Sequence, residues 1–381
     1  KTRRPVFDNL ETIASVVIGS AIALAPLFLG PLLVGEYITS FDISESSAGL
    51  ILSAEMSAFT LGSATIFAIL KQNWRKIVAT AITLMVIGNA AFLVAEGLWI
   101  SVFLRLVAGF GSGMAMTMTI QIVGQMRNPD QIYGLWSVGQ LSLGALGLYF
   151  FPTLIALGGI KALFSVLALL AMLMAFTLQF YPIGRESTPG TDHRHTTPGQ
   201  LTLGLLCLLG LFLYYGAQAG VWAYMELIGT SWNLERKLVS QILFASLIAA
   251  IFGSGLAVML SNRVGRTVPI LAALLISAVS IMMLIQPAGM VRFAVAACLF
   301  NFAWYLFLPY ISAVLAVVDE NGRILTGFAV TTPMSLAAGP AIAALLIAET
   351  HTLASCLIFG LSSIPLGLIL MFPATRLQSI R

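Results

Sequence analysis

The sequence predicts an all-α integral membrane protein with twelve transmembrane helices arranged as two pseudo-symmetric six-helix bundles. The first observation is composition: 59% of the 381 residues are hydrophobic and 9% are charged, whereas a soluble domain has roughly 45–50% apolar and about 25% charged residues. The second is that the apolar residues form runs of about 20 residues, the length that crosses a bilayer as a helix. The third is that the two halves of the chain resemble each other.

The apolar runs are expected to be helices because lipid offers no partner to an unpaired backbone group. They lack the alternating pattern over about ten residues that a transmembrane barrel shows. The predicted spans are residues 13–35, 46–70, 76–95, 98–124, 131–157, 160–181, 200–228, 238–260, 267–286, 290–317, 324–348 and 352–373.

A polar stretch at residues 182–199 interrupts the apolar pattern at the midpoint of the chain. Its proline, glycine and threonine residues predict a linker. The predicted domains are therefore an N-terminal bundle at 1–181 and a C-terminal bundle at 200–381. His193 and His195 of the linker are expected to be solvated, so no metal site and no cofactor are predicted.

The distribution of basic residues predicts the orientation of the chain. Cytoplasmic loops carry an excess of lysine and arginine, so both termini and the linker are expected in the cytoplasm, and no nucleic-acid surface is indicated. Basic residues on the predicted cytoplasmic side are Lys1, Arg3, Arg4, Lys71, Arg75, Lys76, Arg127, Arg185, Arg194, Arg263, Arg266, Arg323, Arg376 and Arg381. The other side has Lys161, Arg236, Lys237 and Arg292, and Arg105 lies inside a span.

An internal repeat relates the two halves. Residues 61–75 align without gaps on residues 252–266, an offset of 191 residues, and the Gly-Ser pair and the final arginine coincide. Two parallel six-helix halves are typical of secondary transporters.

The loops that follow the second and eighth spans are similar to a signature of the major facilitator superfamily. That family has a glycine followed by Asp-Arg-x-Gly-Arg-Arg, and this chain has Ser-Asn-Arg-Val-Gly-Arg at 261–266 and Lys-Gln-Asn-Trp-Arg-Lys at 71–76. Asn262 and Lys71 stand where the family has aspartate. In such short loops the guanidinium groups can cap helix C-termini; plain positive-inside anchors are the alternative.

The fourth span resembles the same family through Arg-Leu-Val-Ala-Gly-Phe-Gly-Ser-Gly at 105–113. Gly109 and Gly113 are four residues apart, so they share a helix face that another backbone can approach closely. A Gly-Pro pair, Gly339 and Pro340, lies in the eleventh span, where the resemblance implies a bend along the seam between the halves.

The resemblance implies the fold named above and secondary active transport by alternating access. The family's exporters carry the Gly-Pro pair in the fifth helix, and this chain lacks it there. Residues assigned by the resemblance to gating or conformational change are Arg75, Lys76, Arg263, Gly265, Arg266, Gly109, Gly113, Gly339 and Pro340.

Glu55 and Arg105 are charged residues within predicted spans, where ionisable groups are costly and usually functional. They lie at similar depths in the second and fourth helices. We therefore expect them to interact, since a pair costs less than either charge alone. Two roles remain open: proton coupling through Glu55, or a structural lock.

Polar and aromatic residues in the fourth, seventh and tenth spans form the predicted substrate cavity, because the family builds its cavity from these helices and the first. Aromatic faces with a few directed hydrogen-bonding groups are typical of small-molecule sites; an interfacial aromatic belt is the alternative. The cavity residues are Gln121, Gln125, Tyr215, Gln218, Trp222, Asn301, Trp304 and Tyr305.

The predicted function is proton-coupled uptake of an organic anion or metabolite across a bacterial inner membrane, by a monomer that is not an enzyme. Two alternatives stay open: a proton-driven exporter of hydrophobic compounds, and a receptor that keeps the fold without transport. Two acidic residues, Glu36 and Glu226, are expected as solvated charges near the outer surface; for Glu226 the alternative is that it lines the outer vestibule.

Overall fold

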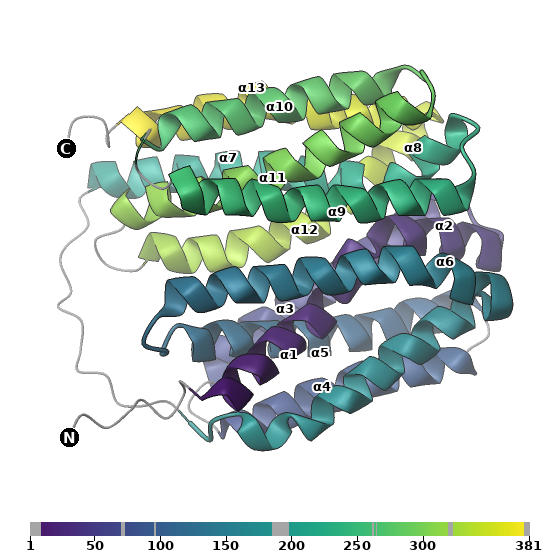
Figure 1. Ribbon diagram of the computed structural model, residues 1–381, viewed down its shortest axis with the longest axis horizontal. Helices are drawn as coiled ribbons and strands as arrows, with labels where there is room; N and C mark the ends of the chain where they lie inside the picture. The colour runs from purple at the N-terminus through teal and green to yellow at the C-terminus, as the bar shows by residue number, and fades with distance from the viewer. Residues whose placement is uncertain are drawn as a thin grey trace. The chain divides into compact units, whose positions relative to one another are not determined.

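The structure is a computed structural model in which every regular element of the described residues is a helix (Figure 1). The described residues are 9–69, 73–94, 97–184, 198–260, 263, 265–318 and 323–376. Predicted features that lie outside them are the greater part of the 182–199 linker with both of its histidines, and Lys1, Arg3, Arg4, Lys71, Arg185, Arg194, Asn262 and Arg381.

The first unit of the chain contains six α-helices and two short 3-10 helices. These are α1 (Leu10–Phe28), α2 (Gly30–Phe41), α3 (Glu45–Ile69), α4 (Trp74–Ala90), η1 (Ala91–Leu93), α5 (Leu98–Val123), α6 (Pro129–Phe176) and η2 (Leu178–Phe180). One of them, α3, is shared with the second unit, as described below.

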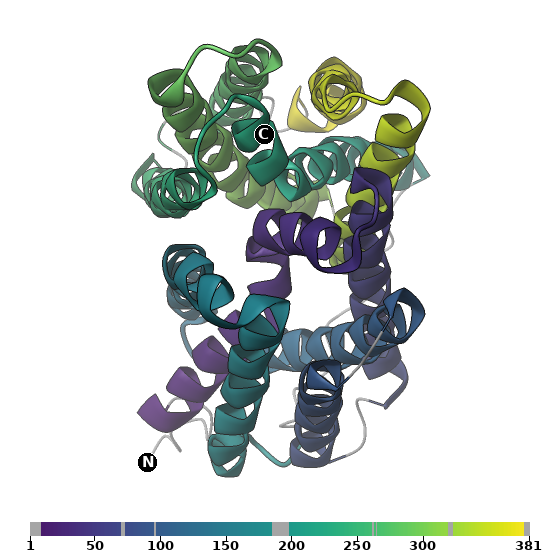
Figure 2. The same ribbon diagram turned by 90° about the vertical axis from the view of Figure 1, so that its right-hand side faces the viewer.

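The second unit contains seven α-helices. These are α7 (Pro198–Ala223), α8 (Met225–Ser231), α9 (Arg236–Leu260), α10 (Thr267–Ile285), α11 (Met290–Val318), α12 (Arg323–Thr350) and α13 (Ala354–Arg376). In Figure 2 many helices of each unit are seen close to end-on, as expected for a bundle.

Eleven of the described helices are long and apolar enough to cross a membrane, and one of them supplies two crossings. The α6 helix has 48 residues, so it would be about 72 Å long if straight, more than twice the ~30 Å hydrocarbon core. It is interrupted at Gly158 and Gly159, and Gly159 has a φ of 61°, which favours glycine. The chain reverses its direction there (Figure 1), which gives the predicted fifth and sixth spans and twelve crossings in all.

Two predicted spans are broken within their length. The first, predicted at 13–35, divides at Leu29 into α1 and α2, with Pro26 shortly before the break and Pro31 shortly after it. Proline removes a backbone donor and disfavours a continuous helix. The seventh, predicted at 200–228, ends at Ala223 and is followed by the separate short helix α8.

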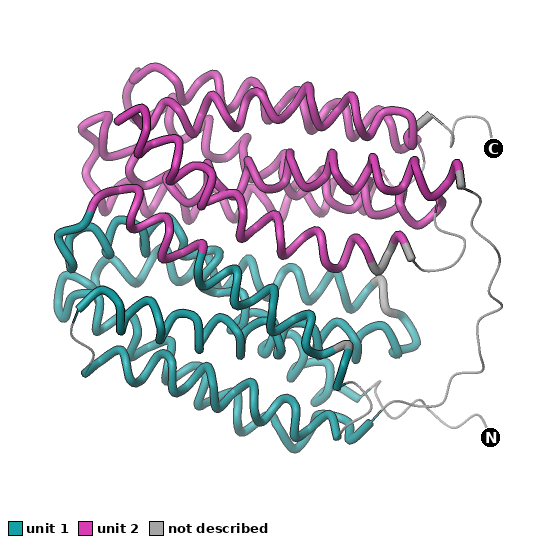
Figure 3. The backbone as a smooth tube through the Cα atoms, turned by 180° about the vertical axis from the view of Figure 1, so that it is seen from behind, with its two compact units in different colours: residues 1–43, 54–189 teal, residues 44–53, 190–381 magenta. Residues whose placement is uncertain are grey.

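The chain divides into two compact units, residues 1–43 with 54–189, and residues 44–53 with 190–381 (Figure 3). The helix α3 is therefore shared. Its first turns belong to the second unit, where Ser53 Oγ donates to the Ala337 carbonyl at 2.6 Å and Tyr224 OH donates to the Glu45 carbonyl at 3.1 Å. The remainder of α3 packs in the first unit.

Glycines allow close helix packing inside each unit. A Cβ atom at Gly109 on α5 would collide with the carbonyl oxygen of Glu55 on α3, and one at Gly113 would collide with that of Phe59. In the second unit a Cβ atom at Gly339 on α12 would collide with the carbonyl oxygen of Gly216 on α7. Such contacts are typical of membrane helices, in which small residues let backbones approach.

Candidate functional site

Arg105 lies fully buried on α5 and is held by several neighbours. Its Nη1 donates to Asn89 Oδ1 at 2.9 Å, and its Nη2 donates to the Gly88 carbonyl at 2.5 Å. Two aromatic rings contact the guanidinium, with Phe164 at 4.0 Å and Phe92 at 5.1 Å from ring centroid to Cζ. Cation–π contacts of this kind are strongest when the cation is desolvated, so the charge has a fixed, built position.

Glu55 on α3 is the acidic partner that the structure brings to Arg105. The distance from Glu55 Oε1 to Arg105 Nη1 is 3.5 Å, and both side chains are fully buried. Neither carboxylate oxygen makes a hydrogen bond. Gly109 permits this approach, because a Cβ atom there would also come within 3.1 Å of Glu55 Cγ.

The arrangement leaves Glu55 poorly stabilised as an anion. A buried charge is normally paired and also hydrogen-bonded, as Arg105 is through Asn89 and Gly88. Glu55 has the ion pair alone. The site therefore consists of a firmly held cation and a carboxyl group without hydrogen bonds.

The corresponding place in the second unit is uncharged. By the offset of 191 residues that relates the two halves, Ser246 of α9 is the residue equivalent to Glu55 in the repeat. There Asn301 Nδ2 of α11 donates to Ser246 Oγ at 2.9 Å. A neutral hydrogen bond is thus sufficient where the repeated helices meet, so helix packing by itself does not require the charges of the first unit.

Sequence reasoning missed most of the shell around Arg105. Asn89 had a signal, since an amide inside a span should turn inward, and its Nδ2 donates to the Met85 carbonyl at 2.9 Å. The sequence carried no signal for Phe92, Phe164 and Tyr37, because apolar and aromatic residues are ordinary in any span. Tyr37 stacks on Phe164 with ring centroids 6.5 Å apart.

Of the predicted cavity residues, Gln218 on α7 and Trp304 on α11 have unused hydrogen-bonding capacity in the second unit. Gln218 is fully buried, and neither its amide oxygen nor its nitrogen has a partner. Trp304 Nε1 is likewise buried without a partner. Tyr215, one turn from Gln218, meets the Trp304 ring edge-on with centroids 5.2 Å apart.

The other predicted cavity residues are placed differently. Asn301 uses its amide nitrogen in the bond to Ser246 and is buried by packing. Trp222 is buried, and Tyr305 is half-buried with its ring 6.3 Å from that of Trp304. Gln121 and Gln125 belong to the first unit. Gln121 is half-buried in the last turn of α5, and Gln125 lies beyond the end of that helix and donates to the Gln121 carbonyl at 3.3 Å.

The arginines predicted at the loops cap neighbouring segments of their own units. Arg75 Nε donates to the Tyr181 carbonyl at 2.5 Å, just beyond η2. Its counterpart in the repeat, Arg266, donates from Nη1 to the Ala313 carbonyl of α11 at 3.0 Å.

The remaining predicted gating residues are surface groups or helix-packing residues. Lys76 and Arg263 are exposed. Gly265 has a φ of 70°, a conformation that favours glycine. Gly339 and Pro340 are buried within α12.

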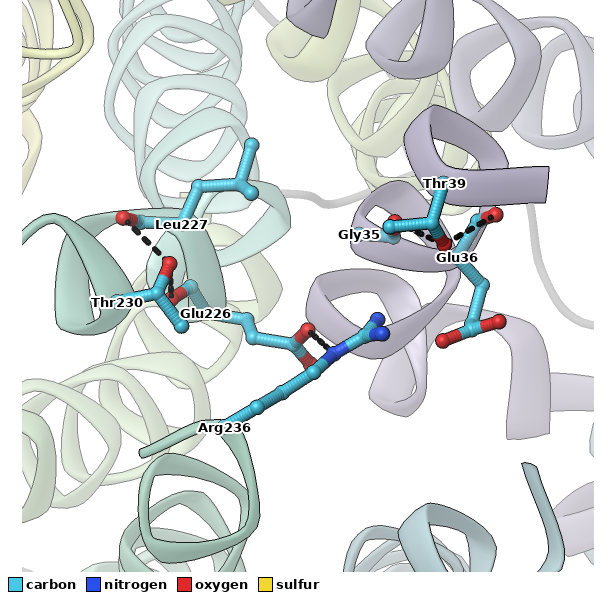
Figure 4. Close-up of polar contacts among 7 residues, drawn as sticks. All are labelled: Gly35, Glu36, Thr39, Glu226, Leu227, Thr230 and Arg236. Atoms are coloured by element: carbon cyan, nitrogen blue, oxygen red, sulfur yellow. Dashed lines mark hydrogen bonds and ion pairs between the residues drawn. The ribbon is translucent and has the colours of Figure 1, made fainter. Parts of the chain in front are cut away.

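Two acidic residues expected to be solvated are instead buried. Glu226 on α8 is 1% exposed and accepts a 2.5 Å bond from Arg236 Nε of α9 (Figure 4). Glu36 on α2 is 3% exposed, and the Thr39 hydroxyl one turn later donates to its backbone carbonyl at 3.2 Å. Their sequence positions indicated nearness to the outer surface, and burial depends on neighbouring segments that the sequence does not identify. Among the described residues no three His, Cys, Asp or Glu side chains gather as a metal site.

The chain is similar to a known protein family and to a solved transporter structure. The sequence model described as Major Facilitator Superfamily matches residues 12–203. The crystal structure of the human organic anion transporter MFSD10 (TETRAN) matches with a TM-score of 0.70 and 16% sequence identity, over 96% of this chain and 99% of that one. No curated protein matches by sequence.

Proposed function

From the premise that this chain belongs to the major facilitator superfamily and is a membrane transporter, we propose that it couples uptake of an organic anion or metabolite to protons. The observation that carries the proposal is the buried Glu55–Arg105 pair. Its carboxyl group has no hydrogen bond, while its guanidinium group is held by two hydrogen bonds and two rings.

The physical argument is that Glu55 has two forms of comparable cost. As an anion it gains the Coulomb attraction of Arg105 but lacks hydrogen bonds, and as a neutral acid it avoids the cost of burial. A change of conformation that alters the distance between α3 and α5 changes this balance. Protonation and conformation are then linked, as coupling requires.

Protonation of Glu55 also leaves Arg105 without its counter-ion. An anionic substrate group supplies a replacement charge, which favours anions as the substrate class. MFSD10, described as an organic anion transporter, shares the fold at 16% identity. The substrate-binding residues we propose in the second unit are Gln218, Trp304 and Tyr215, because their polar atoms or rings are available there.

The transport cycle we propose is alternating access by two bundles, residues 1–181 and 200–381, joined by the cytoplasmic linker 182–199. Both termini are on the cytoplasmic side of a bacterial inner membrane, and the chain acts as a monomer. Arg75 and Arg266 support movement of each bundle as a unit, since each arginine makes a hydrogen bond between two segments of its own bundle.

The experiment is uptake into proteoliposomes under an imposed pH gradient. A thermal-shift screen of organic acids first identifies a ligand, because binding stabilises the folded state. We expect Glu55→Gln to abolish the dependence of uptake on the gradient and to retain ligand binding. Unchanged flux with unchanged pH dependence in Glu55→Gln would remove the coupling role.

Export of hydrophobic compounds is the second candidate. The edge-on contact between Tyr215 and Trp304, and the further ring of Phe300 at 5.9 Å from Trp304, favour an aromatic ligand in the second unit. Proteoliposomes with an inward or an outward pH gradient distinguish the two directions. A proton-driven exporter exchanges its substrate for protons that move in the opposite direction. Accumulation of a lipophilic dye inside the vesicles only when the gradient drives protons out of them would favour export.

A further inference from the structure

Tyr37 on α2 is a buried hydroxyl that the transport scheme above does not use. Its side chain is fully buried and its hydroxyl has no hydrogen-bond partner. A buried polar group left unpaired costs free energy, so an unpaired tyrosine hydroxyl is unusual unless it bonds elsewhere in the working cycle. Phenylalanine would fill the same apolar space without that cost.

The environment of Tyr37 is the environment of the ion pair. Its ring stacks on Phe164, with an interplanar angle of 18°, and Phe164 also lies 4.0 Å from the Arg105 guanidinium. The Phe164 ring thus contacts both the Tyr37 ring and the Arg105 guanidinium, which Glu55 approaches to 3.5 Å. A buried donor without an acceptor and a buried carboxyl group without a donor therefore belong to one cluster of the first unit.

We propose that Tyr37 is a positioning residue whose hydroxyl donates a hydrogen bond to the charged form of Glu55 and so sets the pH at which Glu55 takes up its proton. The inference rests on the proposed proton coupling through Glu55. The short helix α2 is separated from α1 by the break at Leu29, so the position of Tyr37 is not dictated by α1.

Tyr37 offers this pair a neutral donor whose hydrogen is unused. In the described part of the chain the titratable and charged groups of the cluster are Glu55 on α3, Arg105 on α5 and Tyr37 on α2. The α4 helix contributes Asn89, whose amide nitrogen donates one of its two hydrogens to the Met85 carbonyl, and α6 contributes the ring of Phe164. Glu36, the residue before Tyr37, is also buried but has interactions of its own.

The test is an infrared titration of the purified protein in lipid, which needs no substrate. The probe is the C=O stretching band of a protonated carboxylic acid, assigned to Glu55 by its loss in Glu55→Gln. In Tyr37→Phe the ring and its stacking remain while the hydroxyl is absent. We expect the titration midpoint to move upward by about 1 pH unit, because a hydrogen bond to a charged group is lost.

The matched control is Tyr181→Phe. Tyr181 is an equally buried tyrosine of the first unit, and its hydroxyl donates to the Ser15 carbonyl at 2.8 Å. This variant loses a structural hydrogen bond and should leave the Glu55 midpoint in place. Should Tyr37→Phe fail to fold, 3-fluorotyrosine at position 37 keeps both ring and hydroxyl, and its stronger donor should move the midpoint downward.

The outcomes separate the inference from the proposal on which it rests. A Glu55 band that does not titrate overturns proton coupling and the role of Tyr37 together. A titrating band whose midpoint is the same in wild type, Tyr37→Phe and the fluorinated protein overturns the role of Tyr37 alone. Equal shifts in Tyr37→Phe and Tyr181→Phe also overturn it, because they would report general loosening of the first unit.

Discussion

Replacing Arg105 with methionine tests how the first unit tolerates an unpaired buried charge. The variant removes the bonds to Asn89 and Gly88, the two cation–π contacts and the 3.5 Å ion pair to Glu55. Breaking a buried pair from one side typically costs 3–5 kcal/mol, because the other charge stays buried and uncompensated. We expect a loss of about 3–5 kcal/mol at pH values where Glu55 is charged.

The double variant Glu55→Gln with Arg105→Met should recover much of that loss. Replacement of a buried pair by neutral residues of similar volume is often close to neutral in stability, and the Ser246–Asn301 contact shows that the second unit packs without the charges. The two single variants and the double variant form a thermodynamic cycle.

The assay is thermal unfolding of detergent-purified protein, followed by size-exclusion chromatography. At roughly 2–4 °C per kcal/mol for a folding unit of this size, Arg105→Met should melt about 10 °C below wild type. The double variant should melt several degrees above the single variant. Equal melting of the single and double variants would show that the two side chains do not stabilise each other.

Three further outcomes follow from the packing. A Cβ atom at Gly109 meets backbone of α3, whereas one at Gly134 meets nothing within 4 Å. Gly109→Ala should therefore destabilise the protein by about 1–3 kcal/mol, and Gly134→Ala should not. Equal melting temperatures of the two variants would contradict close α3–α5 packing. Asn301→Leu should cost about 1 kcal/mol and leave ligand affinity within about twofold of wild type, measured by thermal shift; a larger affinity loss would make it a binding residue. Trp304→Phe should destabilise through the smaller ring and should weaken ligand binding about tenfold by calorimetry; unchanged binding would exclude the indole N–H from the site.

The sequence predicted the site in part, and the reasons differ from residue to residue. Glu55 and Arg105 were predictable because a charge inside an apolar span is rare and must find a partner. Asn89 was predictable for a similar reason, because an amide inside a span also needs a partner, although burying it costs less than burying a charge. Tyr37 and Phe164 carry no such signal, since an aromatic side chain in a span can face lipid, a neighbouring helix or a ligand with the same sequence pattern.

The predicted cavity residues also differ in how much the sequence could show about them. Composition and helical spacing placed Asn301 with Trp304, but only the fold shows that Asn301 bonds to Ser246 on α9 while Trp304 Nε1 has no partner. Glu36 and Glu226 were placed near the outer surface by their sequence positions. Their burial depends on neighbouring helices that no single span can indicate.

By itself the sequence determined that the chain is a membrane protein of helical spans with a repeat, because hydropathy and helix formation in lipid are local consequences of composition. The tertiary structure decided which buried polar atoms meet and which remain without a partner. Helix crossing and the close approach at glycines fix those distances, and both depend on residues far apart in the chain.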